Sequence, residues 1–168
     1  MVDFLETVTW TLVMSDENKP TAIFFSSHLP CATYPSAGHQ LAYYDLKKLS
    51  ESFSIILIFI YTDKEAYYLG ACNFDFCQNV YPFKSSICRK FTQVFLNPFT
   101  PVTVATKVDR RVPRLINRCV SENSIRLIHC HFAPSGFIAS YVNKGVDIEI
   151  VFADVLSQSA SRRFENSR

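Results

Sequence analysis

Apolar runs of strand length alternate with amphipathic segments of helical spacing along most of this chain. The apolar runs lie at residues 21–27, 53–61, 79–83, 127–128 and 146–155. The helical segments lie at residues 40–52, 63–69, 84–97 and 109–123, and a further helix begins at residues 134–136. Continuous apolar runs are typical of parallel strands that are covered on both faces. The alternation therefore predicts an α/β fold with a mostly parallel sheet.

This pattern divides the chain into one domain and two flanking segments. Residues 21–156 carry the alternating elements. Residues 1–20 fit them poorly, and they form either an extra strand or helix that caps the domain or an N-terminal extension in front of a natural start at Met14. Residues 157–168 are polar and basic, so we expect a polar tail or the start of a truncated linker helix.

Composition narrows the class of protein. Hydrophobic residues make up 48% of the 168 positions and charged residues 19%, which indicates a folded globular domain. A net charge of +2 gives no reason to expect a nucleic-acid partner. The longest apolar run, residues 55–61, is far shorter than the roughly 20 residues of a membrane-spanning helix. Six cysteines without a C-x-x-C pair, and no secretory signal, predict reduced structural thiols in a cytoplasmic protein.

The first strand-to-helix loop excludes the commonest cofactors of such folds. A dinucleotide site needs G-x-G-x-x-G there, so that the backbone can approach a pyrophosphate. Residues 28–39 form a loop of about twice the usual length with a single glycine, Gly38, so we expect no bound cofactor. The loop and its exit carry polar side chains suited to a hydroxyl-rich ligand, namely His28, Tyr34, Ser36, His39 and Gln40. The alternative is a solvated loop whose polar residues have no shared role.

Two further histidines lie at the end of the strand in residues 126–140. His129 and His131 are two positions apart, so they share one face of a strand. A metal site or a metal-dependent hydrolase would need a third ligand, and none has suggestive spacing, so we expect no metal. A histidine at a strand end can orient or deprotonate a sugar or alcohol hydroxyl. The alternative is a packed core histidine, which fits His129 better than His131.

Two other features remain open to more than one interpretation. Asp154, at the end of the last expected strand, could accept hydrogen bonds from a ligand hydroxyl or cap the helix that follows. The basic segments 84–90 and 107–118 could face anionic lipid head groups at the periphery of a membrane. They could equally be solvated helix faces.

Three segments together resemble the N-terminal domain of family 4 (group 1) glycosyltransferases. The first is residues 23–30 (Ile-Phe-Phe-Ser-Ser-His-Leu-Pro) followed by 35–41 (Pro-Ser-Ala-Gly-His-Gln-Leu) and the helix end 46–50 (Leu-Lys-Lys-Leu-Ser). The second, residues 129–136 (His-Cys-His-Phe-Ala-Pro-Ser-Gly), is similar to the family's His-x-His-x-x-x-x-Gly segment. The third, residues 151–157 (Val-Phe-Ala-Asp-Val-Leu-Ser), looks like the strand that closes that domain.

The resemblance implies a fold, a site and partners. The fold would be a Rossmann-like three-layer sandwich, the N-terminal half of a GT-B architecture whose active site lies between two domains. His131 would be catalytic, and His28, Gly38, His39 and Asp154 would bind the substrate. The partners would be a sugar or lipid-linked acceptor and a separate C-terminal donor-binding domain. The loop departs from the pattern, because it has one glycine where many members have two.

The same resemblance limits the expected activity. The family's nucleotide-sugar site, with its E-x7-E carboxylate pair, has no counterpart in these 168 residues. We therefore expect a glycosyltransferase-like protein of polysaccharide biosynthesis that binds the acceptor and is inactive alone. The alternative is a non-catalytic binding or interaction module derived from that domain.

Overall fold

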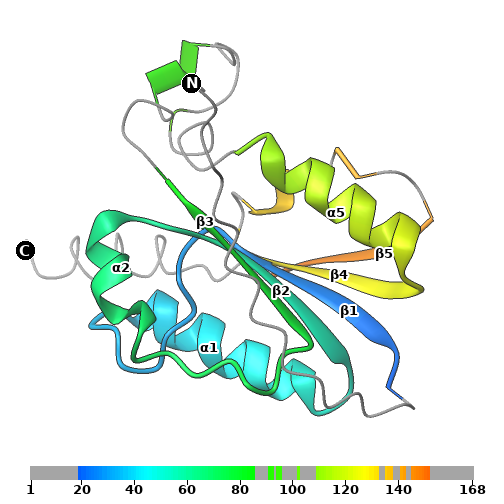
Figure 1. The fold of residues 1–168 in the computed structure, drawn as a ribbon, viewed down its shortest axis with the longest axis horizontal. Coiled ribbons are helices and arrows are strands. Elements are labelled where there is room, and N and C mark those ends of the chain that lie inside the picture. Colours follow the sequence, from blue (N-terminus) through cyan, green and yellow to red (C-terminus); the bar gives the residue numbers. More distant parts are fainter. Residues whose placement is uncertain are drawn as a thin grey trace, which may run out of the picture.

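The computed structural model describes residues 19–85, 91–92, 94–95, 102, 109–132, 135–137, 141–142 and 145–151 (Figure 1). In chain order its elements are β1 (Thr21–Ser26), α1 (Ala37–Ser50), β2 (Ser54–Tyr61), α2 (Asp63–Leu69), β3 (Asn79–Lys84), α5 (Arg111–Glu122), β4 (Ile125–His131) and β5 (Asp147–Val151). The expected alternation of strands and helices is confirmed within this part of the chain.

The five strands form a single sheet in the order β3-β2-β1-β4-β5, and every neighbouring pair is parallel. The sheet is thus entirely parallel in the described residues, with β1 at its centre, and its order is Rossmann-like. The chain runs from β1 outward to β3 and then crosses back, so that β4 lies on the other side of β1. Such a reversal of direction leaves a crevice at the carboxyl ends of the strands, where open α/β sheets bind ligands.

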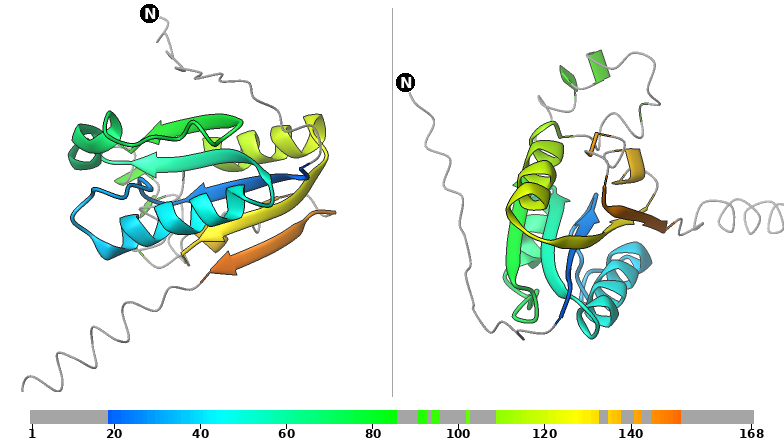
Figure 2. Two further views of the ribbon diagram at one scale, coloured as in Figure 1. Left: turned by 90° about the horizontal axis from the view of Figure 1, so that it is seen from below. Right: turned by 90° about the vertical axis from the view of Figure 1, so that its right-hand side faces the viewer.

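The two faces of the sheet are covered by different helices, as Figures 1 and 2 show for α1 and α5. Alternate residues of a strand point to opposite faces. Ile23, Phe25, Ile56 and Ile58 pack with Val112, Ile116 and Cys119 of α5. Phe24, Leu57 and Phe59 pack with Leu46 of α1 on the opposite face. Each fully buried Ile or Phe stabilises the fold by roughly 1.5–3 kcal/mol relative to its exposed state.

Several expected boundaries were wrong or incomplete. The first helix begins at Ala37, because Ser36 has the extended conformation of an N-cap residue. Gly38 and His39 therefore belong to the first turn of α1 and not to the preceding loop. Lys84 ends β3 and does not begin a helix. In the expected helix 84–97, residues 84 and 85 are not helical, residues 91–92 and 94–95 are, and the rest lies outside the described residues.

Other expectations fall partly or wholly on residues that the structure does not describe. These include residues 1–18, 152–155 and 157–168, so the roles expected for the two flanking segments stay predictions. The expected helix 109–123 begins at Arg111, whose backbone N–H donates to the carboxylate of Asp109 at 3.0 Å. Among the described helices, none combines the length and apolar character needed to cross a bilayer.

We expect replacement of Gly136 by alanine to lower the free energy of unfolding. A Cβ at Gly136 would stand 2.9 Å from two side-chain carbons of Ile150, and a β-branched side chain yields little at such a contact. The expected cost is about 1–3 kcal/mol, measured by urea denaturation.

Gly70 provides the matched control. It has φ −69°, and nothing lies within 4 Å of an added Cβ. The Gly70→Ala variant should be unchanged or more stable by about 0.4–1 kcal/mol. Equal effects of the two substitutions would contradict the close packing of Gly136 on β5.

Candidate functional site

All four histidines of the chain lie at the carboxyl edge of the sheet, beside β1 and β4. His28 follows β1, His39 lies in the first turn of α1, and His129 and His131 end β4. The ring centroids of His28 and His39 are 4.7 Å apart, and those of His28 and His131 are 6.0 Å apart. Because Ser26 pairs with His131 in the sheet register, the two strand ends arrive together. This edge is the crevice that the strand order creates.

The structure thus brings together His28, Gly38, His39 and His131, four of the five residues expected to form the site. The fifth, Asp154, lies outside the described residues.

The turn after β4 holds an aromatic side chain against these histidines. Phe132 has φ 72°, in the left-handed region that bulky residues rarely adopt. The Ser135 hydroxyl donates to the carbonyl of His131 at 2.6 Å, and the Ser135 N–H donates to the carbonyl of Phe132 at 3.0 Å. The Phe132 ring centroid consequently lies 4.3 Å from that of His131 and 4.7 Å from that of His28.

Gly38 permits this arrangement. A Cβ at Gly38 would stand 3.3 Å from Cζ of Phe132, closer than most side-chain contacts. The single glycine of the loop therefore has a structural role here, which is to let the first turn of α1 approach the Phe132 ring.

His131 is fully buried and neutral. Burial, aided by the nearby His129, lowers the pKa of His131 to about 4. Asp45 Oδ2 lies 3.4 Å from His131 Nδ1, but the geometry is not that of a hydrogen bond, and a neutral imidazole forms no ion pair. Neither ring nitrogen has a hydrogen-bond partner within the described part of the chain. The side chain of His131 is closed to solvent, so a ligand would reach this ring only after a neighbouring side chain moves.

Glu65 of α2 is a member of the cluster that the sequence analysis missed. Its carboxylate is buried and accepts four hydrogen bonds. Oε2 accepts from the backbone N–H and the hydroxyl of Thr62, both at 2.6 Å, which caps α2. Oε1 accepts from the backbone N–H of Leu29 at 3.2 Å and from His39 Nε2 at 2.7 Å. Burial opposes ionisation of Glu65, but these hydrogen bonds outweigh it and lower the pKa to about 2.

Glu65 also fixes the tautomer of His39. A carboxylate with so low a pKa only accepts hydrogen bonds, so the proton of neutral His39 lies on Nε2. Nδ1 is then a free acceptor, and it has no hydrogen-bond partner among the described residues. The ring is also held by stacking on Tyr34, with centroids 3.9 Å apart.

His129 has the surroundings of a packed core histidine, the alternative to a ligand-binding role. Its side chain is buried, its Nδ1 lies 2.9 Å from Oε2 of Glu149 on β5, and its ring stacks on Phe24 with centroids 4.9 Å apart. In the described ranges, no three His, Cys, Asp or Glu side chains are placed to hold a metal ion.

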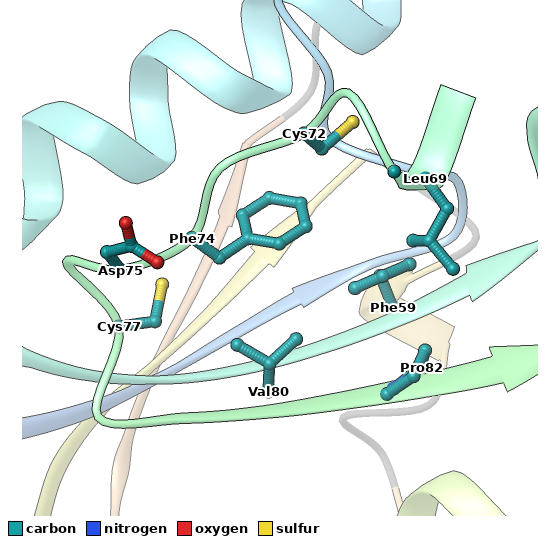
Figure 3. A pocket seen from close by; sticks show the side chains of 9 residues that line it. Phe59, Leu69, Cys72, Phe74, Asp75, Cys77, Val80 and Pro82 are labelled. Carbon is teal, nitrogen blue, oxygen red and sulfur yellow. The ribbon is translucent and has the colours of Figure 1, made fainter. Parts of the chain in front are cut away.

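A separate pocket of about 450 Å³ lies beside β2 and β3 (Figure 3), and none of its lining residues is a histidine. Its walls are mostly apolar, and its volume is within the range of small-molecule sites. The lining residues are Phe59, Leu69, Gly70, Cys72, Phe74, Asp75, Cys77, Val80 and Pro82. None of them was identified from the sequence as a site residue.

Comparison of the chain with family models, with curated proteins and with solved structures found no match in any of the three.

Proposed function

We propose that this chain supplies the acceptor-binding wall of a glycosyltransferase that transfers a sugar from a nucleotide-sugar to a glycan or lipid-linked acceptor. The observation that supports the proposal is the convergence of His28, His39 and His131 from three separate segments on the carboxyl edge between β1 and β4. In α/β sheets this edge is where ligands bind. The family resemblance of the same segments gives the substrate class.

The chemistry of the cluster suits a ligand hydroxyl. His39 is oriented by Glu65, and its buried Nδ1 is an unpartnered acceptor that a ligand hydroxyl would reach only after a neighbouring side chain moves. Asp45 offers a carboxylate whose side chain is about one-third exposed. His131 stays unprotonated down to a pH of about 4, so it could accept the hydroxyl proton of an acceptor as a general base. For this step one of the side chains that pack against His131 must move aside. A separate C-terminal domain would hold the nucleotide-sugar.

A peripheral contact with anionic lipid is a secondary part of the proposal. Of the arginines on and before α5, Arg111 pairs with Asp109, and Arg118 pairs with Glu122. Arg110 and Arg114 are exposed and would be the residues that face lipid phosphates.

One observation favours the non-catalytic alternative. His131 is completely closed to solvent, and its ring packs against Phe24 and Phe132. A buried, neutral histidine can serve as a packing residue in a module that binds a partner or a glycan without transferring a sugar.

We expect alkyl glycosides and free hexoses, N-acetylhexosamines and inositol to shift amide signals at the carboxyl edge of the sheet in an NMR titration. The shifts should centre on Leu29, Gly38, His39 and Phe132. Loss of one hydrogen bond to a ligand hydroxyl weakens binding by about 0.5–1.5 kcal/mol, so His39→Ala should reduce affinity roughly 2–10-fold.

Glu122→Gln, at the far end of α5, is the matched control and should bind as the wild type does. Shifts elsewhere, or equal affinity of the His39 variant, would contradict the proposed site. A transfer assay separates the two functions: turnover restored by a separately expressed donor domain supports the enzyme, and binding without any such restoration supports the module.

A further inference from the structure

The pocket beside β2 and β3 lies between the sheet and a connecting segment. Its floor is the sheet, where Phe59 of β2 and Val80 of β3 line it. Its cover is the connection between α2 and β3, residues 70–78, and Figure 3 shows Phe74 of this connection above the strands. These residues pack in the same apolar cluster as Leu46 of α1, so the pocket opens on the face of the sheet that α1 covers.

The 70–78 connection is held in place at both ends. At its start, the N–H of Ala71 donates to the carbonyl of Tyr68 at 3.0 Å, next to the last turn of α2. At its end, the N–H of Gln78 donates to the carbonyl of Ile55 on β2 at 2.8 Å. A site whose backbone is fixed before a ligand arrives loses less conformational entropy on binding, which favours affinity.

Small side chains leave the space under the 70–78 connection unfilled. Gly70, Cys72 and Cys77 line it, and a Cβ added at Gly70 would meet no atom within 4 Å. Burial raises the pKa of both thiols, that of Cys77 to about 12, so they stay protonated and present apolar surface. The rings of Phe59 and Phe74, with centroids 5.7 Å apart, add two aromatic walls. At about 450 Å³ the pocket has room for a small organic molecule.

One carboxylate stands among these apolar walls. Asp75 is exposed and is the charged member of the lining set. Its backbone N–H donates to Oδ1 of Asn73 at 2.8 Å, but its carboxylate has no hydrogen-bond or ion-pair partner within the described ranges. Figure 3 shows Asp75 at one end of the pocket and Leu69 and Pro82 at the other. A ligand with an apolar body and a cation at one end would therefore match the pocket along its length.

We propose that this pocket binds a small organic cation, with its aromatic body against Phe59, Phe74 and Val80 and its ammonium group at Asp75. The apolar body supplies most of the affinity, because each buried methylene group tightens binding about fourfold. The carboxylate supplies selectivity for positive charge, which amounts to about 2–5-fold at an exposed position. The pocket shares no lining residue with the histidine cluster, and the inference does not depend on the proposed function.

The test compares probes that share one apolar body and differ in charge, namely 4-phenylbutylamine, 4-phenylbutanol and 4-phenylbutyrate. Each is titrated into the full chain near neutral pH and followed by NMR. We expect saturable shifts of the amide signals of Leu69, Phe74, Cys77 and Val80, with NOE contacts from the phenyl protons to the methyl groups of Leu69 and Val80. The amine should bind about 2–5-fold more tightly than the alcohol, and the carboxylate more weakly than the alcohol.

Variants separate the charge from the apolar body. Asp75→Asn should remove the advantage of the amine and leave binding of the alcohol unchanged. Glu51→Gln is the matched control, because it removes another exposed carboxylate, at the C-terminal end of α1 and outside the lining set. Val80→Phe should weaken binding of all the probes, by about fourfold for each methylene group that the larger side chain keeps out.

Equal affinities of the amine and the alcohol for the wild type, or an unchanged preference for the amine in Asp75→Asn, would overturn the proposal that Asp75 selects a cation. The absence of saturable shifts at the pocket, or shifts centred on His39 and Phe132, would overturn the pocket as the binding site.

Discussion

Replacing Glu65 with alanine should lower the free energy of unfolding by about 3–5 kcal/mol, the largest effect expected of any single substitution described above. The carboxylate is buried and accepts four hydrogen bonds from α2, from the backbone of Leu29 and from His39. Its removal leaves all four donors without that acceptor and cuts the link between α2 and the β1–α1 loop. Urea denaturation near neutral pH measures the change.

Asp63 gives the matched control on the same helix. Its carboxylate pairs with Lys84 at 2.7 Å, but both side chains are mostly exposed, so Asp63→Asn should change stability little. The loss of stability in Glu65→Gln should fall between those of Glu65→Ala and Asp63→Asn. An amide keeps one acceptor oxygen, but it places an NH2 donor opposite the donors of Thr62. If Glu65→Ala proved as mild as Asp63→Asn, the carboxylate would not hold the loop.

The pH dependence of Glu65 has a defined sign and window. Its pKa falls from 4.5 in the unfolded chain to about 2 in the fold, so the unfolded chain binds the proton first as the pH decreases. The stability from Glu65 is fully present above pH 4.5 and is lost as the pH falls towards about 2. With an allowance for solvent screening, the loss amounts to about 2 kcal/mol. The Glu65→Gln variant should lack this loss.

Replacing His131 with leucine should remove a second, separate acid-sensitive window. The pKa of His131 falls from 6.5 in the unfolded chain to about 4 in the fold, mainly because of burial. As the pH falls from 6.5 towards about 4, the unfolded chain takes up a proton that the folded chain refuses. The wild type should therefore lose about 2 kcal/mol across this window, and His131→Leu should not.

Near neutral pH the same variant should be as stable as the wild type or more stable. Both ring nitrogens of His131 are buried without a hydrogen-bond partner among the described residues, and a buried unsatisfied polar group costs about 1–3 kcal/mol. Loss of the aromatic contacts with Phe24 and Phe132 offsets part of that gain. Urea midpoints measured above and within the window separate the two effects.

The Glu65→Gln variant serves as the control. It lacks only the acid-sensitive window of Glu65, which lies at lower pH, so the window of His131 should persist in it. The groups that face His131 are Asp45, His129 and His28, so the histidine signals should also be followed by NMR. A His131 signal that titrates at an ordinary pKa would show that the ring is hydrated and would contradict the burial on which the prediction rests.

The sequence pattern predicted the candidate site in part. His131 is predicted because it lies at a strand end, and His28, Gly38 and His39 because they lie in the loop that follows a strand. The carboxyl ends of parallel strands meet at one edge of a sheet. Glu65 was missed for a physical reason. Thr62 and Glu65 have the spacing of a capping box, so a contact within α2 is enough to account for a glutamate at position 65. Its second oxygen reaches His39, 26 residues away in the chain, and no local pattern reveals such a contact.

The sequence by itself determined the elements and the fold class. Residues 22–25 and 55–60 are apolar throughout, and a strand covered on both faces buries such a run. Tertiary structure alone decided that β4 pairs with β1, which sets His131 beside His28, that Phe132 packs against both rings, and that Glu65 reaches His39. The physical reason is that burial patterns specify which face of each element is covered, whereas strand order and side-chain neighbours depend on packing between segments distant in the chain.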